Sequence, residues 1–156
     1  MANFSLYSEL QKAKLKVRRK DGDETLQVVR PFYTDVLEVD WGTTHYTIVR
    51  SGLIIRGAKI YKEKEYIGKV EEKIGFMTQF EIHRKAKQVM ELKEHETLLK
   101  QHYEITKDGK HIGKIQPHGV YVPLLSNLGK GVEGEYTGIS KEDEEILLMS
   151  ILALGV

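Results

Sequence analysis

The sequence contains no cysteine among its 156 residues. This absence excludes disulfide bonds, cysteine-ligated zinc fingers, iron–sulfur clusters and thiol catalysis. The first twenty residues lack the apolar run of a signal peptide, so we expect a cytoplasmic protein. Only three prolines occur, and neither they nor the fourteen glycines cluster as a linker would, so we expect one domain over residues 1–156. The net charge of +1 disfavours a protein whose whole surface binds nucleic acid.

Short segments of alternating polarity dominate the chain. Leu15 and Val17 alternate with Lys14, Lys16 and Arg18, and the same period of two recurs in two later segments. A period of two is typical of half-buried β-strands, because successive side chains of a strand point to opposite faces. The alternation therefore predicts a mainly β protein.

An internal similarity relates residues 60–70 to residues 105–115. Both segments begin and end with apolar residues, carry lysine at Lys62 and Lys107, and contain the sequence Ile-Gly-Lys. Each is typical of a β-hairpin, with a strand, a polar turn and a second strand. Similar units open at Val17, Val39, Ile60, Ile82, Ile105 and Leu125 and close at Leu26, Tyr46, Ile67, Val89, Ile112 and Val132. The regular spacing predicts six repeated hairpins and about twelve strands, while unrelated hairpins would also give an all-β protein.

Two glycines interrupt the alternation in the two most similar hairpins. Gly68 separates Ile67 from Val70, and Gly113 separates Ile112 from Ile115. Glycine inside a strand often marks a bulge or the close approach of another backbone. We expect one of these features at each glycine, rather than a phosphate-binding loop, because no helix signal follows.

The C-terminus changes from strand to helix periodicity. Ser140 begins a capping-box-like sequence, and from Ile146 to Leu154 only Ser150 is polar. A helix over residues 140–155 would have a part that is apolar on all sides and must be surrounded. Its residues 141–154 span only about 21 Å, which is too short for a bilayer. Barrels of about eleven strands can hold a central helix. We therefore predict a closed antiparallel barrel of about twelve strands around a central hydrophobic C-terminal helix.

Three parts of the sequence carry a family resemblance: residues 66–70, residues 103–115 and the terminal residues 143–154. With the succession of short strands, they make the chain similar to the tubby C-terminal-like superfamily over roughly residues 40–156. That superfamily includes the LURP-one-related proteins and phospholipid scramblases. The resemblance implies a twelve-stranded barrel around a hydrophobic helix and a binding or membrane-adaptor role. Tubby proteins bind phosphoinositide head groups through basic residues, but no motif here matches those residues, so none is transferred.

The first candidate site is a basic stripe formed by Lys12, Lys14, Lys16 and Arg18, which share one face of a predicted strand. Such a stripe can bind anionic lipid head groups. No aromatic residue interleaves it, so nucleic acid is not an expected partner. The alternative is a solvated strand face whose charge is balanced by the acidic residues 133–145.

The second candidate site is the turn that carries Arg84, Lys85 and Lys87, which an ordinary exposed charged turn explains equally well. Trp41 is expected to pack at a hairpin or at the mouth of the barrel, with stacking on a ligand as the alternative. The six histidines lack the spacing of a zinc protease, and no residue pair marks a general acid and base. We expect no metal and no cofactor.

The sequence thus favours a non-enzymatic binding or adaptor protein, peripheral to a membrane, that engages anionic lipid head groups or a protein partner through these basic residues. A lipocalin-like carrier of a small apolar ligand is the alternative, and it requires an open barrel interior. An enzyme on the same scaffold has no positive sequence support, although a fold does not decide a function.

Overall fold

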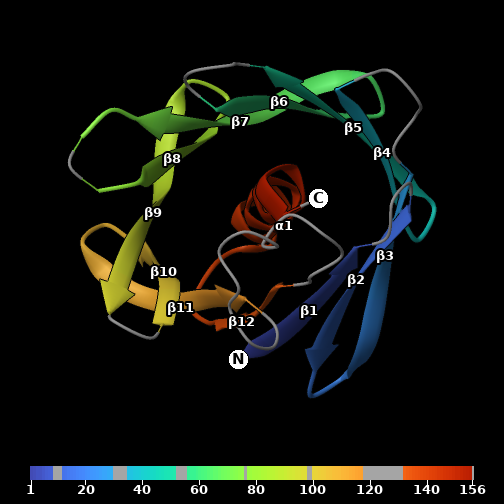
Figure 1. Cartoon of the computed structure of the whole chain (residues 1–156). Coiled ribbons are helices and arrows are strands. Elements are labelled where there is room, and N and C mark those ends of the chain that lie inside the picture. Colours follow the sequence, from blue (N-terminus) through green and yellow to red (C-terminus); the bar gives the residue numbers. More distant parts are fainter. Residues whose placement is uncertain are drawn as a thin grey trace.

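The computed structural model describes residues 1–8, 12–29, 35–51, 56–75, 77–97, 100–117 and 132–155. Within these residues, twelve antiparallel strands close into a barrel around one helix, as predicted (Figure 1). The strands are β1 (Ala2–Ser8), β2 (Lys12–Arg19), β3 (Gly22–Val29), β4 (Val36–Trp41), β5 (Thr44–Ser51), β6 (Gly57–Lys62), β7 (Glu65–Lys73), β8 (Gln79–Arg84), β9 (Lys87–Thr97), β10 (Lys100–Lys107), β11 (Lys110–Pro117) and β12 (Val132–Tyr136). The helix α1 spans Lys141–Gly155.

Five of the six predicted hairpins are confirmed, each with a two-residue turn. In a regular hairpin with such a turn, residues seven apart lie directly opposite, as Val39 and Tyr46 do. The step between apolar residues in the sequence therefore indicated a hairpin at each of these places, and the step of seven from Val39 to Tyr46 also indicated the paired residues. The other four hairpins differ. Leu26 lies opposite Leu15 rather than Val17, and Ile60, Ile82 and Ile105 each pair with the residue eight positions on, because the second strand of each carries a bulge.

The sixth predicted hairpin, residues 125–132, lies outside the described residues except for Val132, which begins β12. The neighbours of β12 in the barrel are β11 and β1. None of the predicted hairpins includes β1, the strand that pairs with both β12 and β2 and so closes the barrel. Closure leaves none of the twelve described strands as a sheet edge.

The two interrupting glycines serve both roles that the sequence predicts. Ile60 pairs with Gly68 and Ile105 pairs with Gly113, so the residue before each glycine is a bulge. A side chain at Gly68 would overlap the carbonyl oxygen of His83 on β8 and would lie 2.8 Å from Ile146 Cδ1 of α1. Glycine therefore allows the backbone and the central helix to approach closely. The β8–β9 hairpin carries a third bulge, which no glycine marks in the sequence.

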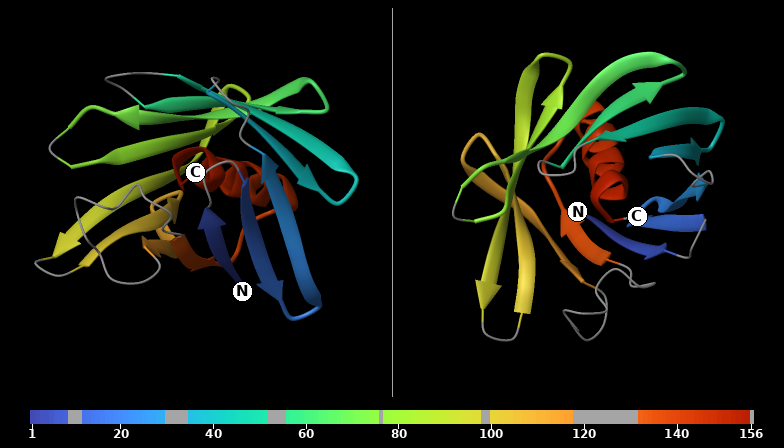
Figure 2. Two further views of the ribbon diagram at one scale, coloured as in Figure 1. Left: turned by 45° about the vertical axis from the view of Figure 1, so that its right-hand side comes forward. Right: turned by 45° about the horizontal axis from the view of Figure 1, so that its top comes forward.

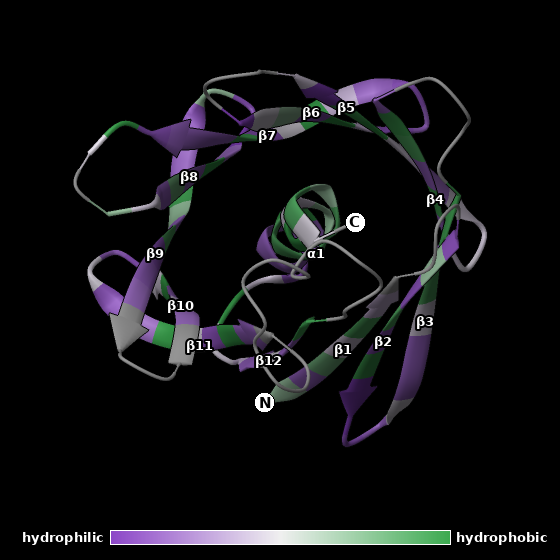
Figure 3. Cartoon of the chain, in the orientation of Figure 1, coloured by the Kyte–Doolittle hydropathy of each residue, from purple (hydrophilic) through white to green (hydrophobic). Residues whose placement is uncertain are grey.

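The helix begins where the sequence predicts, because the Ser140 hydroxyl caps it by accepting a hydrogen bond of 3.2 Å from the backbone amide of Asp143. Hydrophobic side chains of α1 face the inner surfaces of the strands, and the apolar colouring of the helix continues around it (Figure 3). Leu147, Leu148 and Leu152 are wholly buried. Ser150 is also buried, and its hydroxyl donates to the carbonyl oxygen of Ile146. The apolar helix thus fills the barrel interior.

The barrel has two distinct ends (Figure 2). The turns of the five hairpins and the first turn of α1 lie at one end, which we call the hairpin end. The other end, which we call the far end, is where α1 finishes, because a Cβ at Gly155 would lie 2.9 Å from Leu6 of β1. Among the described residues, no helix combines the length and hydropathy needed to span a membrane.

Candidate functional site

The basic stripe lies on the outer face of β2. Lys12, Lys14, Lys16 and Arg18 are exposed, while Ala13, Leu15 and Val17 between them point into the core. Alternate residues of a strand are about 6.6 Å apart, so the four cations span about 20 Å along the barrel wall. The strand directs the stripe from Lys12 at the far end to Arg18 near the hairpin end.

The neighbours of the stripe across the two adjacent strands are mostly uncharged. Lys16 lies opposite Ser5 on β1 and Thr25 on β3, and Lys14 lies opposite Tyr7 and Gln27. Arg18 is the exception, because Asp23 is its cross-strand partner on β3. The stripe is therefore strongly positive around Lys14 and Lys16, and its charge is partly compensated by Asp23 at Arg18.

The cations of the stripe also lack ion-pair partners, in contrast to many others on the barrel. Within the described parts of the chain, none of the ion pairs involves Lys12, Lys14, Lys16 or Arg18. By comparison, Lys69 bonds Glu71 at 2.6 Å on the outer wall. The stripe thus presents uncompensated charge to the solvent.

The second candidate cluster does not join the stripe. β8, which ends at Arg84, is six strands from β2 in either direction around the barrel, so the cluster lies on the opposite wall. Lys85 and Lys87 are exposed at that hairpin end. Arg84 instead turns toward the helix and lies 3.5 Å from a carboxylate oxygen of Asp143. The structure therefore assigns Arg84 a contact inside the barrel mouth.

Arg84 belongs to a ring of cations at the barrel mouth, which the hairpin repeat builds and which we call the mouth ring. In each of four hairpins, a cation stands two residues after the opening apolar residue and reaches an acidic residue in the first turns of α1. These cations are Arg19, Lys62, Arg84 and Lys107. Trp41 occupies the same position in the remaining described hairpin. The sequence showed only one hint of this ring, the equivalence of Lys62 and Lys107.

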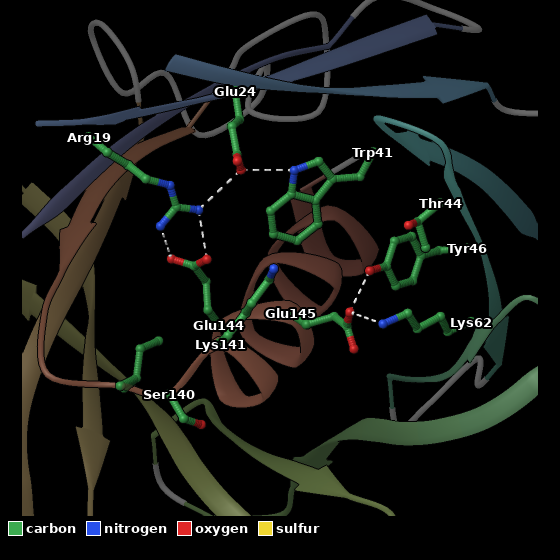
Figure 4. Close-up of a pocket in the computed structure, with 11 residues that line it drawn as sticks. Arg19, Glu24, Trp41, Thr44, Tyr46, Lys62, Ser140, Lys141, Glu144 and Glu145 are labelled. Atoms are coloured by element: carbon green, nitrogen blue, oxygen red, sulfur yellow. Dashed lines mark hydrogen bonds and ion pairs between the residues drawn. The ribbon is translucent and has the colours of Figure 1, made fainter. Parts of the chain in front are cut away.

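Two of these cations, Arg19 and Lys62, line a cavity of about 460 Å³ at the hairpin end (Figure 4). Arg19 donates two hydrogen bonds to Glu144, at 2.5 and 2.6 Å, and Tyr136 donates a third at 2.7 Å. The hydrogen bond to Glu144 raises the pKa of Arg19, so the guanidinium stays charged. Trp41 donates to Glu24 at 2.9 Å, which confirms its expected place at the barrel mouth.

A second carboxylate of the cavity has a similar set of partners. Glu145 accepts hydrogen bonds from the Tyr46 hydroxyl at 2.5 Å and from Lys62 at 2.8 Å. Burial and the bond to Glu145 raise the pKa of Tyr46 above its usual range, so this phenol stays protonated. The hydrogen bonds and ion pairs of Glu144 and Glu145 with these cations and hydroxyls fasten the start of the helix to the barrel wall.

The histidines contribute contacts on the outer wall. His95 stacks on His102 with ring centroids 5.3 Å apart, and Glu104 bonds both His95, at 2.8 Å, and His111, at 2.6 Å. The hydrogen bond from His111 lowers the pKa of Glu104. His118 lies outside the described residues. Within the described ranges, no group of three acidic or imidazole side chains has the geometry to hold a metal ion.

Comparison with known proteins gave no relative, because no family model, no curated protein and no solved structure matches the chain. The resemblance to the tubby C-terminal-like superfamily therefore stays a prediction.

Proposed function

We propose that this protein is a non-enzymatic peripheral binding protein that attaches to an anionic lipid surface through the basic stripe of β2. One observation carries the proposal: Lys12, Lys14 and Lys16 are exposed on one face and have no ion-pair partner within the described residues. The four cations of the mouth ring, by contrast, are committed to the carboxylates of α1.

The magnitude of the attraction suits reversible binding. A basic residue near an anionic membrane contributes about 1 kcal/mol, so four residues supply about 4 kcal/mol, which is enough for weak binding and is sensitive to salt. The backbone of β2 already holds the four cations in a row, so binding needs to order only their side chains. Binding of this size would depend on the anionic lipid content of the surface.

Acidic residues nearby reduce the attraction without cancelling it. Glu133 and Glu135 stand on β12, which is separated from β2 by β1. Two strand spacings amount to about 10 Å, comparable to the Debye length at 0.1 M salt. These carboxylates are thus farther from the stripe than its uncharged neighbours on β1 and β3, so they weaken its positive potential without reversing it.

The alternative of an apolar-ligand carrier has less support. A carrier holds its ligand inside the barrel, where this protein has the side chains of α1, including the wholly buried Leu147 and Leu148. A ligand would have to displace a helix that the mouth ring fastens at its first turn.

The test is sedimentation of the protein with vesicles of phosphatidylcholine alone and of phosphatidylcholine mixed with phosphatidylserine, at low salt. We expect binding only to the mixed vesicles. Lys14→Glu/Lys16→Glu should weaken it by at least about 2 kcal/mol, or roughly thirty-fold. Lys59→Glu/Lys110→Glu changes the net charge equally at two exposed lysines elsewhere and serves as the control. Equal loss in both variants, or no binding by the unmodified protein, would show that the stripe is not a lipid site.

A further inference from the structure

The exposed apolar side chains of the barrel gather at one end. Six large apolar residues are exposed within the described residues, and five of them lie at the far end: Tyr7, Val29, Val49, Ile74 and Met77. Tyr7, Val29 and Val49 lie within two residues of the far ends of β1, β3 and β5, and the other two lie between β7 and β8. The sixth, Met1, precedes β1 at the hairpin end.

Two of these residues adjoin the basic stripe. Tyr7 lies directly opposite Lys14 across β1 and β2, and Val29 lies directly opposite Lys12 across β2 and β3. Their exposed fractions are 48% and 50%. Aromatic and aliphatic side chains beside long basic ones are typical of a membrane interface, where the cations reach head groups and the apolar groups enter the acyl boundary.

The segment between β7 and β8 supplies two exposed apolar residues at the far end. Ile74 is 82% exposed and Met77 is 55% exposed. Around the barrel, this segment lies five or six strands from β2, close to the opposite wall. The β7–β8 segment and the start of β2 thus lie at the same end of the barrel on opposite walls, so a flat surface placed across that end faces both.

We infer that the far end of the barrel is the membrane-facing end, with Ile74 and Met77 entering the acyl region while Lys12 and Lys14 contact anionic head groups. This inference rests on the proposed function and adds an orientation to it: the barrel stands on its far end. The hairpin end, with its mouth cavity and the turn of Lys85, then faces away from the lipid.

The absence of cysteine makes the orientation directly measurable, because one introduced cysteine gives one labelled position. Ile74→Cys and Met77→Cys would each carry an environment-sensitive fluorophore, and Asp21→Cys, exposed in the β2–β3 turn at the hairpin end, is the matched control. The vesicles contain phosphatidylcholine and phosphatidylserine with a nitroxide on the acyl chain. We expect a blue shift and quenching at positions 74 and 77 and neither change at position 21.

A second variant measures the contribution of the apolar contact. Ile74→Ser/Met77→Ser should reduce vesicle binding about ten-fold or more, because each side chain loses apolar burial, while the melting temperature should not change because both are exposed. If vesicles sediment the protein but positions 74 and 77 are not quenched, or position 21 is quenched equally, the orientation is wrong and the proposed function stands. If vesicles do not sediment the unmodified protein, both are wrong.

Discussion

The ion pair between Arg19 and Glu144 provides the sharpest test of how the helix is held in the barrel. Replacing Arg19 by methionine keeps much of the side-chain length but removes the guanidinium. Glu144, which is 7% exposed, would keep only the hydrogen bond from the Tyr136 hydroxyl. The structure predicts a large loss of stability, because a buried carboxylate would have lost its charge partner.

The magnitude follows from the geometry of the pair. Breaking a buried ion pair by removing one partner costs about 3–5 kcal/mol. Arg19 retains some exposure, with 27% of its side chain accessible, so we expect the lower end, about 3 kcal/mol. For a chain of this size, 1 kcal/mol corresponds to about 2–4 °C in melting temperature, so the expected decrease is about 6–12 °C.

The assay is urea unfolding followed by circular dichroism, with the double variant Arg19→Met/Glu144→Gln as the control. Glutamine removes the unpaired charge and still accepts the bond from Tyr136, so the double variant should recover at least about 1 kcal/mol of the loss. A decrease below about 1 kcal/mol for Arg19→Met would refute the reasoning, since the pair would then behave as a solvent-screened surface pair.

Three further predictions follow from other contacts. Gly68→Ala should destabilise the protein by about 1–3 kcal/mol or more in urea unfolding, because its side chain would overlap the β8 backbone, whereas Gly75→Ala meets nothing closer than 3.9 Å and should be tolerated. Leu148→Ala should cost about 2–5 kcal/mol, because Leu148 is wholly buried, and a loss below about 1 kcal/mol would show that the barrel interior is loosely packed. The hydrogen bond to Asp40, assisted by Glu38, raises the pKa of His45. The protonated imidazole therefore stabilises the folded protein fully below pH 6.5, and this contribution is lost as pH rises through the raised pKa. Titration by nuclear magnetic resonance should show a pKa above 6.5 that Asp40→Asn lowers, and an unchanged value in that variant would contradict the assignment.

The sequence alone predicted the architecture because its patterns are local. A seven-residue step such as Val39 to Tyr46 indicates a hairpin, and alternation around Leu15 reports which strand face is buried. The helix followed from a steric argument, since an apolar rod too short for a bilayer needs a surrounding wall. The basic stripe was also visible, because its members alternate along one strand and require no knowledge of any other strand.

Only the tertiary structure decided which strand closes the barrel and which charges remain free. The pairing of β1 with β12 joins the two ends of the chain, and no local pattern reports a contact between residues so far apart. The same applies to Arg84, which the sequence grouped with Lys85 and Lys87 but which the barrel turns toward Asp143. Whether a cation is paired or free depends on what the closed sheet places opposite it, and closure is a property of the whole chain.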